Sequence, residues 1–440
     1  MQDGSSPGEA EEPSMIQGFA VAAVLAALFA GCAGSGASPS LSRTAARPVN
    51  AHATETVLYS FTDGTDGGGP NGGLVFDSSG NAFGTTHFGG NDSCGGSVGG
   101  GCGVVFELSP SKSGGWSEAP LYTFDDGTDG GFPNAGVILD KNGNAFGTAS
   151  TGGSTQCSIG CGVVYELSNS SGWSESVLHT FVESDGEFPN AVLLPSSNGT
   201  LYSTTWYGGS SGNGTVFSLT PGSSGWTERV LYSFQGTTDG SAPAGGVVAD
   251  RAGNLYGTTY KYDGDNDGVA YELQKKSQGA WKDRDLYTFT NNGGGENPYA
   301  GLIMPAKGTL YGSAIESGPD EGGVAFELVR SKGHQWKQTV LHAFGGTGDG
   351  NAPYGGLVAD KSGNLFGTTV FGGTNNAGIV YELSPTRGGQ WKERIVYSFT
   401  GGADGQYPSG SLTQGASGNL YGSTSNGGKS GYGVVFEITR

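Results

Sequence analysis

The chain has 440 residues, and 86 of them are glycine. That share is about three times the average glycine content of ~7%, and together with 11% aromatic residues it predicts an all-β protein rich in turns. The net charge of −19, with only 21 lysines and arginines, argues against nucleic acid and anionic lipid head groups as partners, because basic side chains carry both kinds of binding.

The first 32 residues resemble an export signal. An apolar run from Phe19 to Ala30 is too short to span a bilayer and has the length of the hydrophobic region of a signal peptide. The small residues before Cys32 resemble a bacterial lipobox, so Cys32 is the candidate lipidation site. Two features depart from that pattern: Phe29 stands where leucine is usual, and the residues before Met15 are acidic, which makes Met15 an alternative start.

Residues 33–53 are rich in glycine, serine and alanine, a composition that cannot form a core and behaves as a flexible linker. We therefore expect an exported bacterial protein that touches a membrane only through its N-terminus. A lipoprotein of the cell envelope is our first interpretation. Secretion after cleavage and an uncleaved anchor are the alternatives.

Two sequence signatures each occur seven times between residues 54 and 440, at a spacing of about 55 residues. The first is Tyr-x-Phe or His-x-Phe, which ends a strand at Phe61, Phe124, Phe181, Phe234, Phe289, Phe344 and Phe399. The second is Gly-Val-Val-Phe-Glu-Leu with variants, and its aromatic residues are Phe106, Tyr165, Phe217, Tyr271, Phe326, Tyr381 and Phe436. A repeat of this length suits four strands.

The sixth repeat shows four expected antiparallel strands, which we call a to d in chain order. They cover residues 355–360, 365–369, 378–383 and 390–399. β-Branched and aromatic residues fill these segments, and Gly, Asn, Pro and Ser separate them. Pairs of glycines begin strand a in several repeats, as expected where the innermost strands crowd around an axis.

Strand c carries a recurring glutamate. In the first repeat, Val104, Phe106 and Leu108 alternate with Val105 and Glu107, which predicts one apolar face and a second face with the glutamate. Equivalent glutamates occur in six repeats, at Glu107, Glu166, Glu272, Glu327, Glu382 and Glu437. Six equivalent positions in six blades cannot converge on one substrate, so we interpret them as cross-strand pairs rather than catalytic groups.

The two ends of the repeat region predict how it closes. Residues 54–61 form a strand d with no strands before it, and residues 433–440 form a strand c with no strand d after it. A ring in which the N-terminal strand completes the C-terminal unit accounts for both ends and leaves no open sheet edge. The sequence therefore predicts an all-β, seven-bladed β-propeller over residues 54–440, with four antiparallel strands in each blade.

The recurring run Gly-Gly-Leu-Val-x-Asp-x-x-Gly-Asn-Leu-Tyr-Gly-Thr-Thr, followed by Gly-Val-Val-Phe-Glu-Leu, resembles the bacterial choice-of-anchor tandem-repeat proteins called GloVer-containing. The resemblance covers residues 54–440. It implies an exported repeat domain that is attached to different surface anchors, which the lipobox-like Cys32 matches. It brings no catalytic residue.

Four of the five cysteines form two local pairs in Gly/Ser-rich b–c loops of adjacent repeats. Cysteine pairs of this kind suit an oxidising compartment. We therefore predict two intraloop disulfides, Cys94 with Cys102 and Cys157 with Cys161.

The b–c and d–a loops are expected on one face of the disc. The b–c loops vary most in length, and variable loops on a rigid scaffold are where binding specificity usually resides. The d–a loops repeat an Asp-Gly-x-x-Pro pattern, which predicts either a ring of carboxylates or simple turns stiffened by proline. Its aspartates are Asp66, Asp129, Asp185, Asp239, Asp349 and Asp404.

One b–c loop has the spacing of a calcium site. Asp263, Asp265 and Asp267 alternate and precede a glycine, which matches the opening of calcium-binding loops. Gln274 stands where an EF-hand has its bidentate glutamate, and a strand follows in place of a helix. The sequence thus leaves two interpretations, a short calcium loop of the kind found in extracellular β proteins or a plain acidic turn. Calcium is the one cofactor it suggests.

No sequence motif for a catalytic triad or a zinc hydrolase stands out. We therefore expect a monomeric, non-enzymatic binding or adhesion module, with a glycan or a protein as its extracellular ligand. One alternative is a carbohydrate-active hydrolase or lyase whose carboxylates are assembled across blades. A structural component of the cell envelope is another, since a fold does not choose among functions.

Overall fold

A computed structural model describes residues 53–440, except residues 92–93, 95–99, 113, 171, 261–266, 291–292, 332–334 and 347. The described residues form one compact unit. The predicted signal segment, Cys32 and most of the predicted linker lie outside the described residues. No helix in the part of the chain that the structure describes is long and apolar enough to cross a bilayer.

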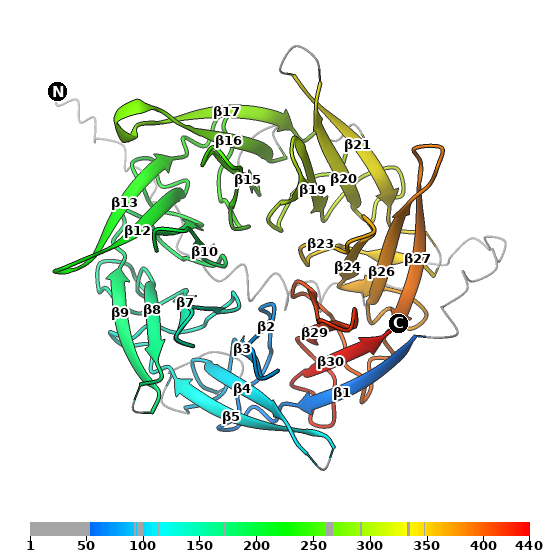
Figure 1. The fold of residues 1–440 in the computed structure, drawn as a ribbon, viewed down its shortest axis with the longest axis horizontal. Coiled ribbons are helices and arrows are strands. Elements are labelled where there is room, and N and C mark those ends of the chain that lie inside the picture. The colour runs from blue at the N-terminus through cyan, green and yellow to red at the C-terminus, as the bar shows by residue number, and fades with distance from the viewer. Residues whose placement is uncertain are drawn as a thin grey trace, which may run out of the picture. The chain divides into compact units, whose positions relative to one another are not determined.

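Seven four-stranded antiparallel sheets are arranged in a ring, with strand a of each blade nearest the axis and strand d at the rim (Figure 1). The predicted seven-bladed β-propeller is confirmed. Blades 1 to 3 comprise β2 (Val75–Phe76), β3 (Ala82–Thr86), β4 (Val104–Pro110) and β5 (Trp116–Thr123); β6 (Ile138–Leu139), β7 (Ala145–Ala149), β8 (Val163–Ser168) and β9 (Ser174–Thr180); and β10 (Leu194–Pro195), β11 (Leu201–Thr205), β12 (Thr215–Gly222) and β13 (Gly225–Ser233).

Blades 4 to 7 repeat this arrangement. Their strands are β14 (Val248–Ala249), β15 (Leu255–Thr259), β16 (Val269–Lys275) and β17 (Trp281–Thr288); β18 (Ile303–Ala306), β19 (Thr309–Ala314), β20 (Val324–Arg330) and β21 (Trp336–Ala343); β23 (Val358–Ala359), β24 (Leu365–Thr369), β26 (Ile379–Pro385) and β27 (Trp391–Ser398); and β28 (Thr413–Gln414), β29 (Leu420–Thr424), β30 (Val434–Thr439) and β1 (Thr54–Ser60). Outside the blades, β22 (Gly350–Asn351) pairs with β25 (Phe371–Gly372), and η1 (Ser277–Gly279) is a short 3-10 turn.

The N-terminal strand β1 closes the ring, as predicted. It pairs antiparallel with β30, and Thr54 lies opposite Thr439 at one end of this pair. The register shifts by one residue between Val57 and Tyr59. Blade 7 therefore has its fourth strand from the opposite end of the domain.

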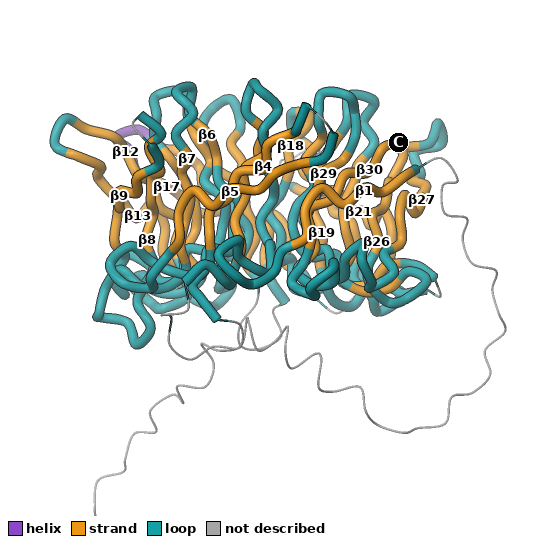
Figure 2. The backbone as a smooth tube through the Cα atoms, turned by 90° about the horizontal axis from the view of Figure 1, so that it is seen from below, coloured by secondary structure: helices purple, strands orange, loops and turns teal. Residues whose placement is uncertain are grey.

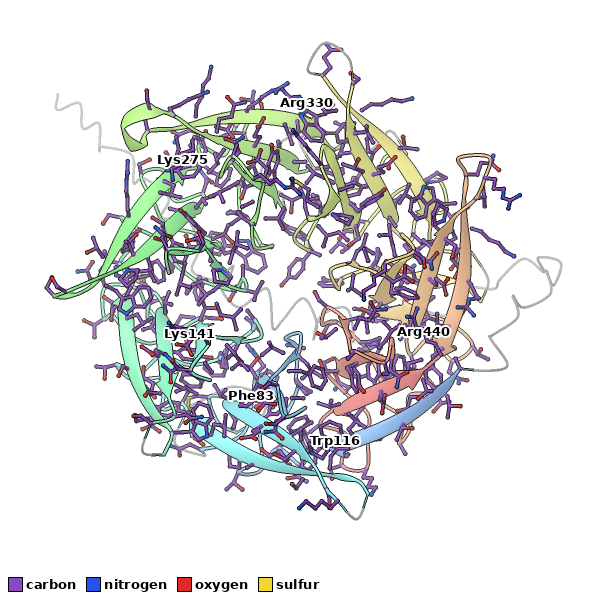
Figure 3. The ribbon with its side chains drawn as sticks, in the orientation of Figure 1. Phe83, Trp116, Lys141, Lys275, Arg330 and Arg440 are labelled. Carbon is purple, nitrogen blue, oxygen red and sulfur yellow. A yellow bond between two sulfur atoms is a disulfide. The ribbon has the colours of Figure 1, made fainter. Side chains whose placement is uncertain are left out.

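The hydrophobic core lies between the blades. Phe83 and Val105 of blade 1 pack with Val137 and Tyr165 of blade 2 in one buried cluster. Figure 3 shows side chains in the spaces between successive blades. Both faces of strand c are therefore buried, and Val105 is fully buried although its alternation with Phe106 predicted an apolar and a polar face. The two-sided burial follows because each sheet is covered by a neighbour on both sides.

Crowding near the axis explains the paired glycines at the start of strand a. A Cβ atom on Gly72 would lie 2.4 Å from the backbone nitrogen of Gly136, and one on Gly245 would lie 2.3 Å from that of Gly301. These distances are too short for any side chain, so the innermost strands require glycine where neighbouring backbones meet.

Loops gather on two opposite faces of the disc (Figure 2). The c–d hairpins, including the one that carries η1, lie on one face, and the b–c and d–a loops lie on the other. The second face holds most of the residues considered below.

Candidate functional site

A residue with left-handed backbone precedes the proline of every d–a loop. The φ angles of these seven residues lie between 51° and 62°, and they are Gly69, Phe132, Phe188, Ala242, Asn297, Ala352 and Tyr407. A bulky residue rarely adopts this conformation, so the surrounding structure must hold it in place.

Backbone hydrogen bonds on both sides hold this residue. The N–H of Phe132 donates to the carbonyl oxygen of Cys102 in the preceding blade, at 2.7 Å. The carbonyl of Phe188 accepts the N–H of Trp206, the residue that follows strand b of the same blade, at 3.0 Å. The repeated pattern brings two positions close to the axis on the b–c/d–a face: the residue after the proline and the residue after strand b.

Four aromatic residues at these two positions form one cluster, which we call the axial aromatic cluster. Tyr299 and Tyr354 follow prolines of d–a loops, whereas Trp206 and Tyr260 follow strands β11 and β15. The ring centroid of Trp206 lies 6.0 Å from that of Tyr260 and 5.9 Å from that of Tyr299. Tyr299 is 5.9 Å from Tyr260 and 4.8 Å from Tyr354. Because Trp206 and Tyr299 belong to blades that are not neighbours, their contact places the cluster near the axis.

The tyrosines of this cluster are uncharged at neutral pH. Burial, followed by Glu316 and Tyr207, raises the pKa of Tyr260 to about 12. Burial and the neighbouring Tyr260 raise the pKa of Tyr299 to about 12 as well. All three tyrosines are half-buried, whereas Trp206 is buried. Their hydroxyl groups can thus donate and accept hydrogen bonds without carrying charge.

A carboxylate lies beside the cluster. Glu316 accepts a hydrogen bond from Nδ2 of Asn297 at 2.9 Å, and the backbones of Glu316 and Glu296 pair with each other. Asn297 is the left-handed residue two positions before Tyr299. The same loop geometry therefore positions an aromatic ring and a negative charge together.

The remaining sector of the axial ring is polar. Asn134, the residue after its proline, donates from Nδ2 to Oγ of Ser150 at 3.1 Å and to Oδ1 of Asn190 at 3.2 Å. Ser409 donates to Oδ1 of Asn71 at 3.0 Å. The face thus presents aromatic rings over blades 3 to 6 and amide and hydroxyl groups over blades 7, 1, 2 and 3.

Both predicted disulfides are present, and they hold b–c loops of this face. The Cα atoms of Cys94 and Cys102 are 5.7 Å apart, and those of Cys157 and Cys161 are 5.3 Å apart. The carbonyl groups of Cys102 and Cys161 accept the N–H groups of the left-handed Phe132 and Phe188. The disulfides therefore brace the carbonyls that hold the next d–a loop.

The predicted calcium loop lies almost entirely outside the described residues. Asp263 and Asp265 are outside them, and Asp267 is described. The N–H of Asp267 donates to the carbonyl of Phe289 at 3.3 Å, and its carbonyl accepts the N–H of Asn297 at 2.8 Å. Its backbone thus takes the same role as that of Cys102, and calcium binding stays a prediction.

The aspartates of the d–a loops make turns, which supports the simpler of the two interpretations. Asp66 is buried, and its carboxylate accepts the backbone N–H groups of Thr62 at 2.9 Å and of Gly64 at 3.2 Å. The hydroxyl of Tyr59 donates to the same carboxylate at 3.1 Å. Asp66 therefore has its hydrogen-bond partners in its own loop and on the strand before it, and it is not part of an open carboxylate ring.

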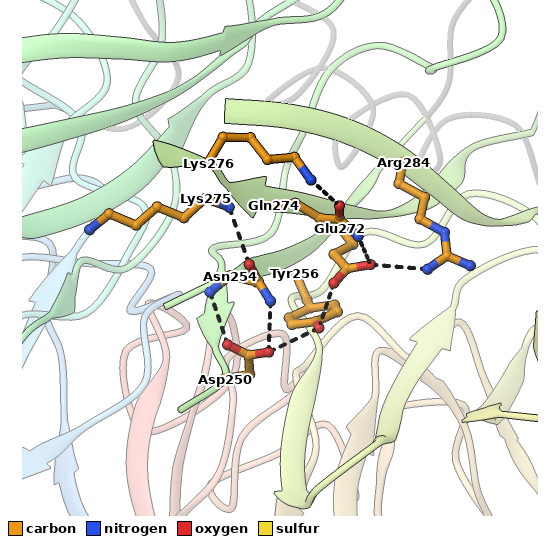
Figure 4. A network of polar contacts seen from close by, with 8 residues as sticks. All are labelled: Asp250, Asn254, Tyr256, Glu272, Gln274, Lys275, Lys276 and Arg284. Carbon is orange, nitrogen blue, oxygen red and sulfur yellow. Dashed lines mark hydrogen bonds and ion pairs between the residues drawn. The ribbon is translucent and has the colours of Figure 1, made fainter. Parts of the chain in front are cut away.

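The glutamates of strand c form cross-strand contacts, as predicted. Figure 4 shows Glu272, which accepts a hydrogen bond from the hydroxyl of Tyr256 at 3.0 Å and lies 3.4 Å from Nη1 of Arg284. The hydroxyl oxygen of Tyr256 also lies 3.3 Å from Oδ2 of Asp250, and Asp250 fixes the a–b turn by accepting the backbone N–H of Asn254. This network is structural, since it lies within one blade, and blades 5 and 7 repeat its tyrosine–glutamate hydrogen bond at Tyr311/Glu327 and Tyr421/Glu437.

The axial aromatic cluster was not predicted from the sequence. Its signal was the appearance of Trp or Tyr at two repeat positions where other blades carry Asn, Ser, Ala, Val, Ile or His. Comparing the repeats position by position would have isolated these residues, but their convergence from four blades required the closed ring.

Comparisons with solved structures return chains of several enzyme classes. A candidate 6-phosphogluconolactonase from Bacteroides uniformis has a TM-score of 0.47 and 13% identity, covering 74% of this chain and 86% of that chain. A glucose dehydrogenase has a TM-score of 0.43 and 15% identity, covering 69% and 94%. The NanB sialidase from Streptococcus pneumoniae has a TM-score of 0.43 and 10% identity, covering 88% and 70%. Identities this low say nothing about activity.

A search of curated protein sequences found no significant match. The model of the Gloeobacter/Verrucomicrobia repeat family matches residues 155–348 and 335–440, which together are more than half of the chain. The matched segments contain the strand signatures that define the blades. The chain therefore belongs to the Gloeobacter/Verrucomicrobia repeat family.

Proposed function

We propose that the propeller is a non-enzymatic binding module displayed outside the cell, with its ligand on the b–c/d–a face over the axial aromatic cluster. The observation that carries this proposal is the convergence of Trp206, Tyr260, Tyr299 and Tyr354 from four blades. Three of these rings are half-buried rather than enclosed in the core. Rings held in contact on a rigid scaffold offer a large binding surface at a small cost in conformational entropy.

The surrounding polar groups favour a glycan as the ligand. Aromatic rings pack against the apolar faces of sugar rings, while the amides of Asn134 and Asn190, the tyrosine hydroxyls and the carboxylate of Glu316 can bind sugar hydroxyl groups. A protein ligand would use the same rings as anchors, and the binding test distinguishes the two.

The test is a glycan array followed by calorimetry with the glycans retained. We expect Tyr299→Ala/Tyr354→Ala to weaken binding by roughly 30-fold or more, because the two truncations together remove anchors worth on the order of 2–4 kcal/mol. Lys112→Ala, in a c–d loop on the opposite face, is the matched control and should bind like the wild type. Equal binding by the wild type and the double tyrosine variant would place the ligand elsewhere and overturn the proposal.

A turnover assay on the same glycans separates the alternatives. A glycan that is bound but not converted to product supports the binding module. Product formation supports a carbohydrate-active enzyme, and neither retention nor product supports a protein ligand or a structural role in the envelope.

Two observations fit an extracellular location: the two disulfides and the bacterial repeat family. We further propose lipid attachment at Cys32. Wild-type protein expressed in a bacterium should incorporate labelled fatty acid and partition into detergent, whereas Cys32→Ala should do neither. Label-free wild-type protein in the culture medium would instead indicate secretion after cleavage.

A further inference from the structure

A set of three side chains recurs where neighbouring blades meet at the rim, and we call it the junction triad. Its first member lies two residues before the phenylalanine that ends strand d. The second is the aspartate of the following d–a loop, and the third is an acidic residue one to three positions after the start of strand d in the next blade. The six triads are Tyr59/Asp66/Glu118, Tyr122/Asp129/Glu175, His179/Asp185/Glu228, Tyr232/Asp239/Asp283, His342/Asp349/Glu393 and Tyr397/Asp404/Glu55.

The junction between blades 4 and 5 has no such triad. There Gln338 donates from Nε2 to the carbonyl oxygen of Gly294 at 2.6 Å.

Four triads contain tyrosine, and their first contact is a hydrogen bond. The hydroxyl groups of Tyr59, Tyr122, Tyr232 and Tyr397 donate to the aspartate carboxylates at 3.1, 3.0, 2.9 and 3.0 Å. A tyrosine hydroxyl is a neutral donor here, because burial first and the adjacent carboxylates next raise the pKa of these four groups above the usual range. A tyrosine triad therefore offers oxygen atoms only, and no nitrogen atom that could bind a metal ion.

Two triads have histidine in place of tyrosine, which changes their chemistry. Nε2 of His179 lies 3.2 Å from Oδ2 of Asp185, and Nε2 of His342 lies 2.9 Å from Oδ2 of Asp349. In each of these two triads, a ring nitrogen of the histidine and one carboxylate oxygen of each acidic residue all lie within 4.8 Å of one another, which is close enough to hold one metal ion. Histidine is partly buried in both cases, with 19% and 12% of the side chain exposed.

The glutamate of the first histidine triad has a buried oxygen, Oε1 of Glu228, with no hydrogen-bond partner among the described residues. The tyrosine triads leave the equivalent oxygen of Glu55, Glu118, Glu175 and Asp283 unpaired as well, so the histidine nitrogen is what distinguishes the two candidate sites. A buried carboxylate oxygen without a partner costs free energy, and a cation placed between it and His179 would remove that cost.

We propose that the two histidine triads bind divalent transition-metal ions, with Zn²⁺ as the reference ion. One imidazole nitrogen and two carboxylate oxygens are a ligand set that Zn²⁺ accepts, with water in the fourth position. Two carboxylates also neutralise the charge of the ion. Metal–ligand bonds of about 2.0–2.2 Å bring ligand atoms to separations near those already present between histidine and aspartate, so the glutamate side chain moves most.

Each ion would join two blades. His179 lies on β9 of blade 2 and Glu228 on β13 of blade 3, while His342 lies on β21 of blade 5 and Glu393 on β27 of blade 6. The ions would therefore link neighbouring blades, whose sheets are separate in the part of the chain that the structure describes. This role is independent of ligand binding at the axial aromatic cluster.

The test is calorimetric titration of the metal-free full chain with ZnCl₂, together with thermal melts in Zn²⁺ and in EDTA. We expect the wild type to bind two more ions than His179→Tyr/His342→Tyr and each single variant to bind one fewer ion than the wild type. Tyrosine occupies this position in four other triads, so these variants keep a side chain that the junction accepts. Zn²⁺ should raise the wild-type Tm, as binding to the folded state requires, and should not raise that of the double variant by the same amount.

A gain-of-site variant provides the converse test. Tyr122→His creates a third histidine triad with Asp129 and Glu175, and we expect it to bind one ion more than the wild type. Cobalt substitution should give the visible absorption of a nitrogen–oxygen site in the wild type and not in the double variant. Equal Zn²⁺ uptake by the wild type and the double variant, or no uptake by the wild type, would overturn the proposal and leave the histidines as hydrogen-bonding groups.

Discussion

Val57 on β1 lies directly opposite Phe436 on β30, so residues from the two ends of the domain form neighbouring positions in one sheet. Val57 packs against the cluster that contains Phe436 and Ile438, which are fully buried. The pair is the point at which the ring closes, and the stability of blade 7 depends on it.

Removing β1 should open the ring. A chain that begins at Thr62 leaves blade 7 with three strands and exposes the edge of β30, so we expect loss of cooperative unfolding and concentration-dependent aggregation. A chain that begins at Ala53 keeps β1 and is the control. Calorimetry and light scattering compare the two, and identical melting of both chains would show that β1 is not needed for closure.

The disulfide in blade 2 should stabilise the b–c loop that holds Phe188. Replacing Cys157 and Cys161 by serine should lower the free energy of unfolding by about 2 kcal/mol, the value expected for closing so short a loop. Reduction of the wild type should shift its Tm in the same direction. Peptide mapping under non-reducing conditions checks the pairing, and cross-linked peptides between the two b–c loops would contradict it.

Stability should fall as the pH rises from about 5 to 8. Burial first, and then the carboxylates of Asp404, Asp66 and Asp129, raises the pKa of Glu55, Glu118 and Glu175 to about 7 in the folded protein. A folded-state pKa above the unfolded value means that the folded state binds more protons. The resulting stability is complete below the unfolded pKa of about 4.3 and is lost as the pH rises through 7.

Glu118→Gln tests this directly, because glutamine is uncharged at every pH. In EDTA we expect its Tm to exceed that of the wild type by roughly 1–3 °C at pH 8 and to match it at pH 5. Lys112→Ala, nearby in sequence and exposed, is the control. A Glu118→Gln variant that is less stable than the wild type at pH 8 would show that the charged carboxylate is stabilising.

The network around Glu272 in blade 4 should contribute to the free energy of unfolding through its hydrogen bonds. Glu272 is only 3% exposed, and its carboxylate accepts hydrogen bonds from the hydroxyl of Tyr256 and the guanidinium of Arg284. Glu272→Ala leaves both groups without this acceptor, and we expect a loss of about 2–3 kcal/mol in the free energy of unfolding. Glu272→Gln keeps an acceptor oxygen and should lose less. Denaturant melts compare the variants, and an equal loss in both would assign the effect to charge rather than to hydrogen bonding.

The acidic loop at residues 263–268 gives a prediction from the sequence alone. Calcium should bind weakly, with a Kd on the order of 10⁻⁴ to 10⁻³ M, and should raise the Tm in proportion to its occupancy. Calorimetry on the wild type and on Asp265→Ala is the measurement, with Mg²⁺ as the control ion. If both proteins take up the same calcium, or neither takes up any, the loop is an ordinary acidic turn.

The amino-acid sequence by itself determined the number of blades, their four strands, the closure by residues 54–61 and both disulfides. Each of these depends on residues that are close in the chain or on a pattern that repeats, and a blade is a local unit of consecutive antiparallel strands. The burial of Val105 could not be predicted in this way, because its face of strand c is covered only when another blade packs against it.

The tertiary structure alone decided where the candidate sites lie. Trp206 and Tyr299 meet at the axis only because the ring closes, and His179 meets Glu228 only because adjacent blades dock at a set angle. The left-handed backbone of Phe132 could not be predicted either, because local sterics disfavour it for a bulky residue and the carbonyl of Cys102 from another blade holds it there. Local sequence preference specifies strands and turns, whereas these contacts depend on how separate blades pack.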